Sequence, residues 1–141
     1  MSLVDSLAGY DAVVLGSAVH DGAWLPEARA FLLEHASDLA TRKVWLFSVG
    51  MADALPRPRR RLAARAEAKQ LAASVPAEIR PRDARLFAGV IRREHLPSRS
   101  ARVRMRMIGG RYGDFRAWPQ IKAWADEIAL ALEPAGTRRS A

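Results

Sequence analysis

Three short runs rich in apolar residues constrain the fold of this 141-residue chain more than any other feature. Ala12–Leu15 and Val44–Phe47 contain no polar residue, which is typical of parallel strands covered on both faces. With Ala84–Val90 they are separated by stretches long enough for helical crossovers. The sequence therefore predicts one parallel sheet built from strands at 11–16, 44–47 and 84–90, and an α/β fold class.

Helical spacing of apolar residues predicts three helices between and after these strands. The expected ranges are Leu25–Leu39, Arg59–Ser74 and Trp118–Leu132, with Ala52–Pro58 as a linker. The second helix is expected to pack through Leu62, Ala66 and Ala73, with Leu71 nearby. Crossovers that advance in one direction place their helices on one face of the sheet, so the first two helices should share a face and the last should cover the other.

Composition excludes several chemistries. The chain has no cysteine, so a disulfide framework, a thiolate metal site and a cysteine nucleophile are excluded, and three scattered histidines give little material for a metal site. No acid pair or nucleophile with a partner base is visible, so we name no catalytic residue. No run approaches the length of a membrane span and no signal peptide precedes the first strand, which favours a cytoplasmic protein.

Four segments carry a resemblance to a known family: Tyr10–His20, Val44–Gly50, Arg85–Gly89 and Gly113–Trp118. Together they resemble the flavodoxin-like family, especially the branch close to menaquinone-dependent protoporphyrinogen oxidase. The likeness covers roughly residues 7–132. It implies a three-layer flavodoxin-like fold, an FMN cofactor and an oxidoreductase that moves electrons.

The resemblance also predicts an N-terminal truncation. Only about ten residues precede the first strand, whereas the family begins with a strand and a hydroxyl-rich loop that holds the FMN phosphate at a helix N-terminus. We therefore expect a truncated domain over 1–133 with about three strands and three helices, a disordered tail over 134–141, and weak or absent FMN binding. The Asp11–Gly16 strand would be an unprotected edge, so either the chain forms a homodimer there or the sequence is incomplete.

By resemblance, two loops would flank the isoalloxazine ring of FMN. The predicted cofactor-binding residues are Ser17, Ala18, Val19, His20 and Trp24 in the first loop and Ser48, Val49, Gly50 and Met51 in the second. Gly16 is expected to end the first strand, Trp24 to stack on the ring, and Gly50 to supply a positive φ that aims N–H groups at it. The simpler alternative is a pair of ordinary strand-to-helix turns, with Trp24 packed in the core.

Charge is unevenly placed along the chain. The net charge of +8 divides into −5 over residues 1–40, +13 over 41–111 and zero over 112–141. Ile91–Gly113 is expected to be irregular, and the alternation of basic and apolar residues over 102–107 would give an extended segment one basic and one apolar face. We interpret Arg99–Arg106, with Arg57–Arg61, as a contact with an anionic membrane surface, which would make the protein peripheral to the inner face of the membrane.

Two other interpretations of these arginines stay open, a solvated loop and an arginine-rich coding bias. Nucleic-acid binding is a poorer interpretation, because no recognition motif or aromatic platform accompanies the charge. The leading hypothesis is thus an FMN-domain protein that transfers electrons or acts as a protoporphyrinogen-oxidase-like oxidoreductase in its complete form. The alternative is a non-enzymatic remnant or interaction module that does not bind FMN.

Overall fold

A computed structural model describes residues 6–20, 22–96 and 98–134. Its main sheet has four strands in the order β2-β1-β3-β4. Their bounds are β1 Ala12–His20, β2 Ala23–Trp24, β3 Lys43–Gly50 and β4 Asp83–Ala88. β1, β3 and β4 are parallel, as predicted, and only the two-residue β2 is antiparallel. The predicted α/β class with a parallel sheet is therefore confirmed.

The first strand is longer than predicted. Gly16 does not end it, because β1 continues to His20 and pairs Ser17 with Ser48 and Ala18 with Val49 in β3. Gly16 serves a packing role instead, since a Cβ at this position would overlap the ring of Phe47. The turn that follows β1 contains Gly22, whose φ of +78° is the left-handed value that favours glycine.

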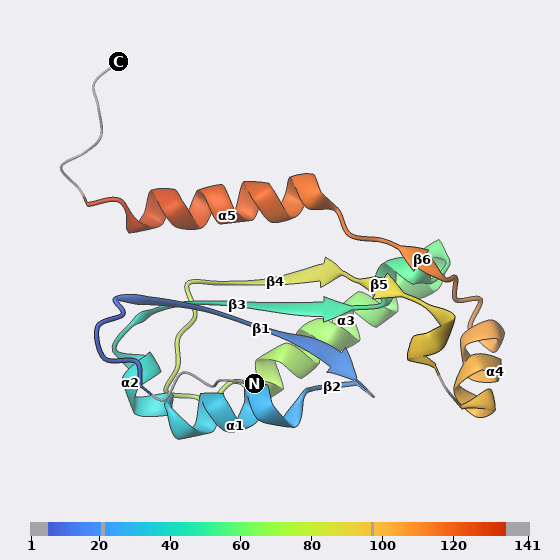
Figure 1. Cartoon of the computed structure of the whole chain (residues 1–141), viewed down its shortest axis with the longest axis horizontal. Helices are drawn as coiled ribbons and strands as arrows, with labels where there is room; N and C mark the ends of the chain where they lie inside the picture. The colour runs from blue at the N-terminus through green and yellow to red at the C-terminus, as the bar shows by residue number, and fades with distance from the viewer. Residues whose placement is uncertain (1–5, 21, 97, 135–141) are drawn as a thin grey trace, which may run out of the picture.

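Helices cover the two faces of the sheet as predicted. Their bounds are α1 Pro26–Glu34, α2 Ala36–Ala40, α3 Arg57–Ser74, α4 Arg99–Met107 and α5 Trp118–Leu132. Figure 1 shows α1 and α2 on one side of the strands and α5 on the other, and α3 joins the first group through Leu71. Leu32, Leu39 and Leu71 of the first group pack with Val44 and Leu46 of β3. On the other face, Trp124 and Ile128 of α5 pack on Trp45.

Two helix predictions were wrong in detail. The helix expected over 25–39 is broken at His35, whose φ of −104° and ψ of 19° separate α1 from α2 and allow both Leu32 and Leu39 to be buried. In α3 most of the expected packing face is exposed, Leu62 to 71%, and only Leu71 beside it is buried. The core instead fixes the rotation of α3 through Leu71, and that rotation buries Glu67 one turn earlier.

The expected linker and the expected irregular stretch both contain regular structure. Ala52–Ala54 forms the 3-10 helix η1, and Pro58 lies in the first turn of α3. Beyond β4, the short strands β5 (Val90–Ile91) and β6 (Gly113–Asp114) pair with each other. The 3-10 helix η2 (Arg93–His95) and α4 lie between these two strands.

The arginine-rich segment within this stretch is therefore helical, not extended. Ser98 caps the N-terminus of α4, because its Oγ accepts a hydrogen bond from the N–H of Ala101. Burial of Met105 anchors the helix.

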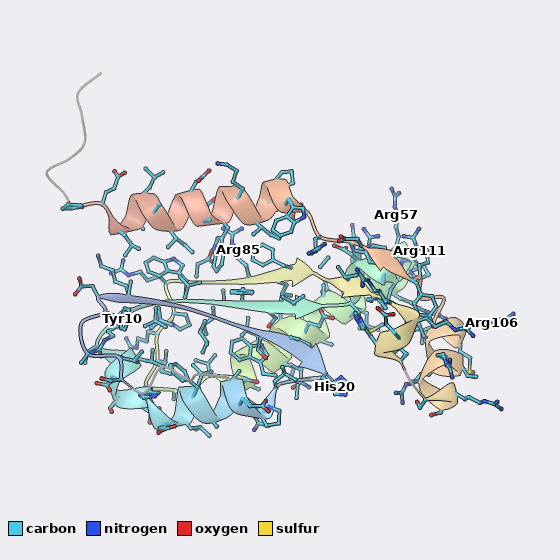
Figure 2. All side chains as sticks on the ribbon, viewed as in Figure 1. Tyr10, His20, Arg57, Arg85, Arg106 and Arg111 are labelled. Atoms are coloured by element: carbon cyan, nitrogen blue, oxygen red, sulfur yellow. The ribbon has the colours of Figure 1, made fainter. Side chains whose placement is uncertain are left out.

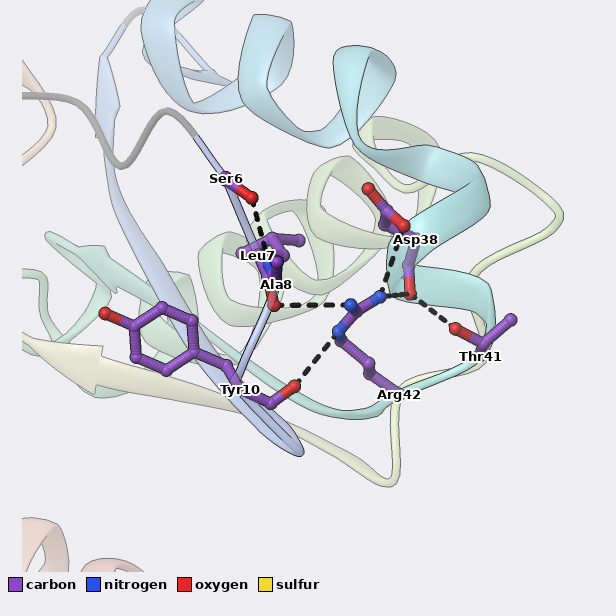
Figure 3. Close-up of polar contacts among 7 residues, drawn as sticks. All are labelled: Ser6, Leu7, Ala8, Tyr10, Asp38, Thr41 and Arg42. Carbon is purple, nitrogen blue, oxygen red and sulfur yellow. Dashed lines mark hydrogen bonds and ion pairs between the residues drawn. The ribbon is translucent and has the colours of Figure 1, made fainter.

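The segment before β1 is held by one side chain. Arg42, in the turn between α2 and β3, donates from Nε to the carbonyl of Tyr10 (3.0 Å) and from Nη2 to the carbonyl of Leu7 (3.2 Å). Its Nη1 donates to the carbonyl of Asp38 at 2.6 Å, as Figure 3 shows. Arg42 thus fixes the entry to β1 against α2. The predicted disordered tail, 134–141, lies outside the described residues apart from Pro134.

We expect Gly16→Val to lower the free energy of unfolding by roughly 1–3 kcal/mol, because its side chain would collide with the Phe47 ring inside a packed sheet. Chemical denaturation followed by circular dichroism measures the change. Gly9→Ala is the control: no atom lies near its added Cβ, so only its positive φ, +87°, can strain the variant. A Gly16→Val protein as stable as the native chain would contradict the close approach.

Candidate functional site

The two predicted loops lie side by side at the carboxyl end of the sheet. The register of β1 and β3, with Ala18 opposite Val49, brings the ends of these strands together. Ser17, Ala18, Val19 and His20 belong to β1 itself, and Ser48, Val49 and Gly50 belong to β3. In open α/β sheets, ligands bind outside the carboxyl ends of the strands. The structure thus brings the predicted residues to the carboxyl end of the sheet, as expected. Most of them lie within strands and not in loops.

Trp24 is a core residue. Its side chain is 2% exposed, and Nε1 donates a hydrogen bond of 2.6 Å to the Oγ of Ser48, which is fully buried. This hydrogen bond joins β2 to β3, the strands on either side of β1. It gives each of the two buried polar groups a hydrogen-bond partner. The structure therefore places Trp24 where it cannot stack on a ligand at the surface, as the simpler alternative expected.

Ser17 also uses its hydroxyl within the protein. Oγ accepts a hydrogen bond from the N–H of Leu25 (3.1 Å) and donates to the carbonyl of Ala18 (2.9 Å). The first contact ties the end of β1 to the residue that precedes α1. The hydroxyls of Ser17 and Ser48 both stabilise the ends of the strands, and neither is directed at the exterior.

Glu67 is the residue that the sequence analysis missed. It lies on α3, is 9% exposed, and its Oε1 accepts a hydrogen bond of 3.1 Å from the N–H of Met51. Its carboxylate lies directly against Gly50, where a Cβ would overlap it. Gly50 is therefore required for close approach, and the expected positive φ is wrong. The signal in the sequence was a lone acid four residues before Leu71, on the same side of the helix.

The pKa of Glu67 reflects this burial. Desolvation raises the pKa above its ordinary value of 4.5, and the charge of Asp53 raises it further. Hydrogen bonds from the N–H groups of Met51 and Ala52 oppose the shift. An internal carboxylate thus occupies the N–H groups that the second loop was expected to offer to a ligand.

The remaining predicted residues are open to solvent to different degrees. Ala18, His20 and Met51 are exposed, and Val19, Val49 and Gly50 are partly buried. Two grooves adjoin this set without containing all of it. One, of about 320 Å³ between the sheet and α5, includes Val49, and the other, of about 940 Å³ along β1, includes Ser17 and Ala18.

Arginines gather beyond this end of the sheet. Figure 2 shows Arg57, Arg106 and Arg111 there, on and around the first turn of α3 and α4. Segments 53–61 and 92–111 together contain eleven arginines and only two acids, Asp53 and Glu94. The segments are joined by a hydrogen bond from Arg111 N to the carbonyl of Ala54 (3.0 Å). The resulting positive field favours an anionic ligand or partner at the carboxyl ends.

Comparison with family models gives a match to the flavodoxin domain over residues 2–113. The chain belongs to the flavodoxin domain family. This membership supports an FMN-type electron-transfer protein, and the matched range includes all nine predicted cofactor-binding residues. A search of curated proteins found no match.

The described residues fit the ring of FMN better than its phosphate. Ala18, His20 and Met51 are exposed at the ends of β1 and β3, so a flat ligand has access to them. A phosphate, however, requires several fixed donors, whereas the N–H of Met51 and the hydroxyls of Ser17 and Ser48 are paired internally. Over 6–20, 22–96 and 98–134, no cluster of His or acidic residues could hold a metal ion, and no helix is long and apolar enough to cross a membrane.

We expect Glu67→Gln to change how stability depends on pH. Because the folded pKa of Glu67 lies above its unfolded value, its contribution to stability is fully present below pH 4.5 and is lost as pH rises through the folded pKa. Relative to Glu67→Gln, the native protein should therefore lose stability between pH 4 and neutral pH. Chemical denaturation at several pH values measures the difference.

Glu78→Gln, which changes an exposed acid, is the matched control and should follow the native pH profile. A stability difference between native protein and Glu67→Gln that stays constant across this pH range would contradict the burial of a charged carboxylate.

Proposed function

We propose that this flavodoxin-family chain takes part in flavin-dependent electron transfer, with the flavin ring at the carboxyl ends of β1 and β3. The supporting observation is the parallel register that brings Ala18–His20 next to Val49–Met51 at the end of the sheet where ligands of open α/β folds bind. The flavin supplies the redox chemistry when bound. The protein borders the ring, and the arginines of 53–61 and 92–111 give this end of the sheet a positive charge.

The finer assignment, to the branch of menaquinone-dependent protoporphyrinogen oxidase, is also a proposal. It rests on the resemblance of all four segments to that branch, including Arg85–Gly89 and Gly113–Trp118 in the second half of the chain. These last two segments correspond to most of β4 and to β6 with the approach to α5. The alternative, an interaction module without FMN, predicts that no flavin binds under any condition.

We expect this chain to bind FMN with a dissociation constant weaker than about 1 µM, because the phosphate lacks fixed donors, each worth roughly 1.5–3 kcal/mol when charge-assisted. Riboflavin, which has the same ring but no phosphate, should bind within about tenfold of FMN. Quenching of flavin fluorescence measures both constants.

Sub-micromolar, stoichiometric binding of FMN with a strong preference over riboflavin would contradict this expectation. The arginines of 53–61 and 92–111 would then be the candidates for holding the phosphate, and raising the salt concentration would reduce the preference. No quenching by either flavin would favour the interaction module.

A second proposal concerns α4. Met107, 76% exposed, and Val103 project on the side of α4 opposite the buried Met105, and Arg99, Arg104 and Arg106 flank them. An exposed apolar strip bordered by arginine is typical of helices that lie on anionic membranes. This geometry replaces the extended segment expected from the sequence and supports the same partner, an anionic lipid surface.

The protein should sediment with anionic vesicles and be released by salt, because each arginine near such a surface contributes about 1 kcal/mol that screening removes. The variant Arg99→Glu with Arg106→Glu should lose binding. The variant Arg29→Glu with Arg80→Glu has the same net charge but changes exposed sites outside α4, so it should largely retain binding. Equal loss in both variants would indicate that α4 has no special role.

A further inference from the structure

The outer edge of β1 is a strand edge without a partner over most of its length. β2 pairs with β1 only at Val19 and His20. Over 12–18, no strand in the described part of the chain pairs with the side of β1 opposite β3. This stretch, AVVLGSA, contains no charge and no proline, so it lacks the side chains that usually prevent edge-to-edge pairing.

Grooves lie along this edge on both faces of the sheet. On the α5 side, Val14 lines the groove of about 320 Å³ with Phe47, Val49 and Trp124. On the α1 side, Val14 and Leu15 line the groove of about 940 Å³ with Leu25 and Phe31. Val14 borders both grooves and is 48% exposed. An added strand would therefore place apolar side chains on both faces, one set toward each groove.

The edge is rigid at both ends. At its amino end, Arg42 holds the carbonyls of Leu7 and Tyr10, and both residues line the larger groove (Figure 3). At its carboxyl end, β2 covers Val19 and His20 and is fixed by the bond between Trp24 and Ser48. A partner strand can thus pair with seven residues, from Ala12 to Ala18, and no further.

We propose that the occupant of this edge is β1 of a second copy of the chain, paired antiparallel about a two-fold axis at Leu15. β1 is itself apolar on both faces, so it matches both grooves. The two-fold axis makes the contacts of the two copies identical and forms a closed dimer. Pairing centred on Leu15 joins Ala12 to Ala18 of the other copy and uses the whole free edge. A register shifted toward the carboxyl end would collide with β2.

Charge favours the same arrangement. The arginine-rich segment 92–111, which contains α4, lies beyond the carboxyl ends of the strands (Figure 1). At the amino ends, Asp11 and Asp38 are balanced by Arg42 and Lys43, and Arg42 pairs with Asp38. Antiparallel pairing places the basic ends of the two copies far apart. Parallel pairing would bring two segments of net charge +6 together.

Sedimentation equilibrium of the full chain tests the proposal. At about 100 µM the native protein should have twice the mass of one chain. Val14→Lys adds a charge at a half-exposed position on the edge and should weaken dimerisation at least about tenfold. Leu130→Lys changes an exposed residue of α5 away from the edge and should leave it unchanged. Thermal unfolding followed by circular dichroism verifies that both variants fold.

The absence of native cysteine allows the register to be tested separately. Under mild oxidation, Leu15→Cys should form a disulfide between copies, and Leu130→Cys should not. A native protein that stays monomeric at about 100 µM overturns the proposal. A dimer that Val14→Lys leaves intact, or one in which Leu15→Cys does not cross-link, overturns it as well.

Discussion

Parallel pairing of β1, β3 and β4 is the constraint from which the rest of this structure follows. Each of these strands ends at the same side of the sheet, so the chain has to return along a face before the next strand begins. Both returns, through α1–α2 and through α3, use the same face. The opposite face depends on α5, which covers Trp45 and the rings of Phe47 and Phe87 and leaves Val14 half exposed. The grooves and the free edge are consequences of this one-sided layering.

Polar groups at the carboxyl end of the sheet mainly stabilise the protein itself. The indole of Trp24 bonds to Ser48, the hydroxyl of Ser17 bonds to the backbone before α1, and Glu67 binds the N–H of Met51. These bonds hold the strand ends in place, which a ligand site requires. The same bonds remove donors that a phosphate would need. The positive charge of the end comes instead from arginines on α3, α4 and the adjoining turns.

The arginines act in two different ways according to their surroundings. Arg42 is a structural residue, because its guanidinium joins three backbone carbonyls from two segments that are far apart in sequence. Arg59 similarly donates to the carbonyl of Met107 and holds α4 against α3. Arg99, Arg104 and Arg106 lie on the exposed sides of α4 and extend the positive field outward. Composition alone does not separate these roles, since it counts every arginine equally.

The sequence by itself determined the α/β class, the parallel strands, the faces of the crossover helices and α5, and the end of the sheet where the site lies. The class, the strands and the faces of the helices follow from apolar runs and helical spacing, which are local patterns. The end of the sheet proposed for the ligand follows from the family resemblance and from the general position of ligands in open α/β sheets. Only the tertiary structure decided the length of β1, because the role of Gly16 depends on Phe47 from another strand. It likewise placed Trp24 in the core and Glu67 against Gly50, and it made 99–107 helical. Each of these features depends on which side chain from a distant part of the sequence lies opposite. The spacing of residues along a single strand or helix does not carry that information.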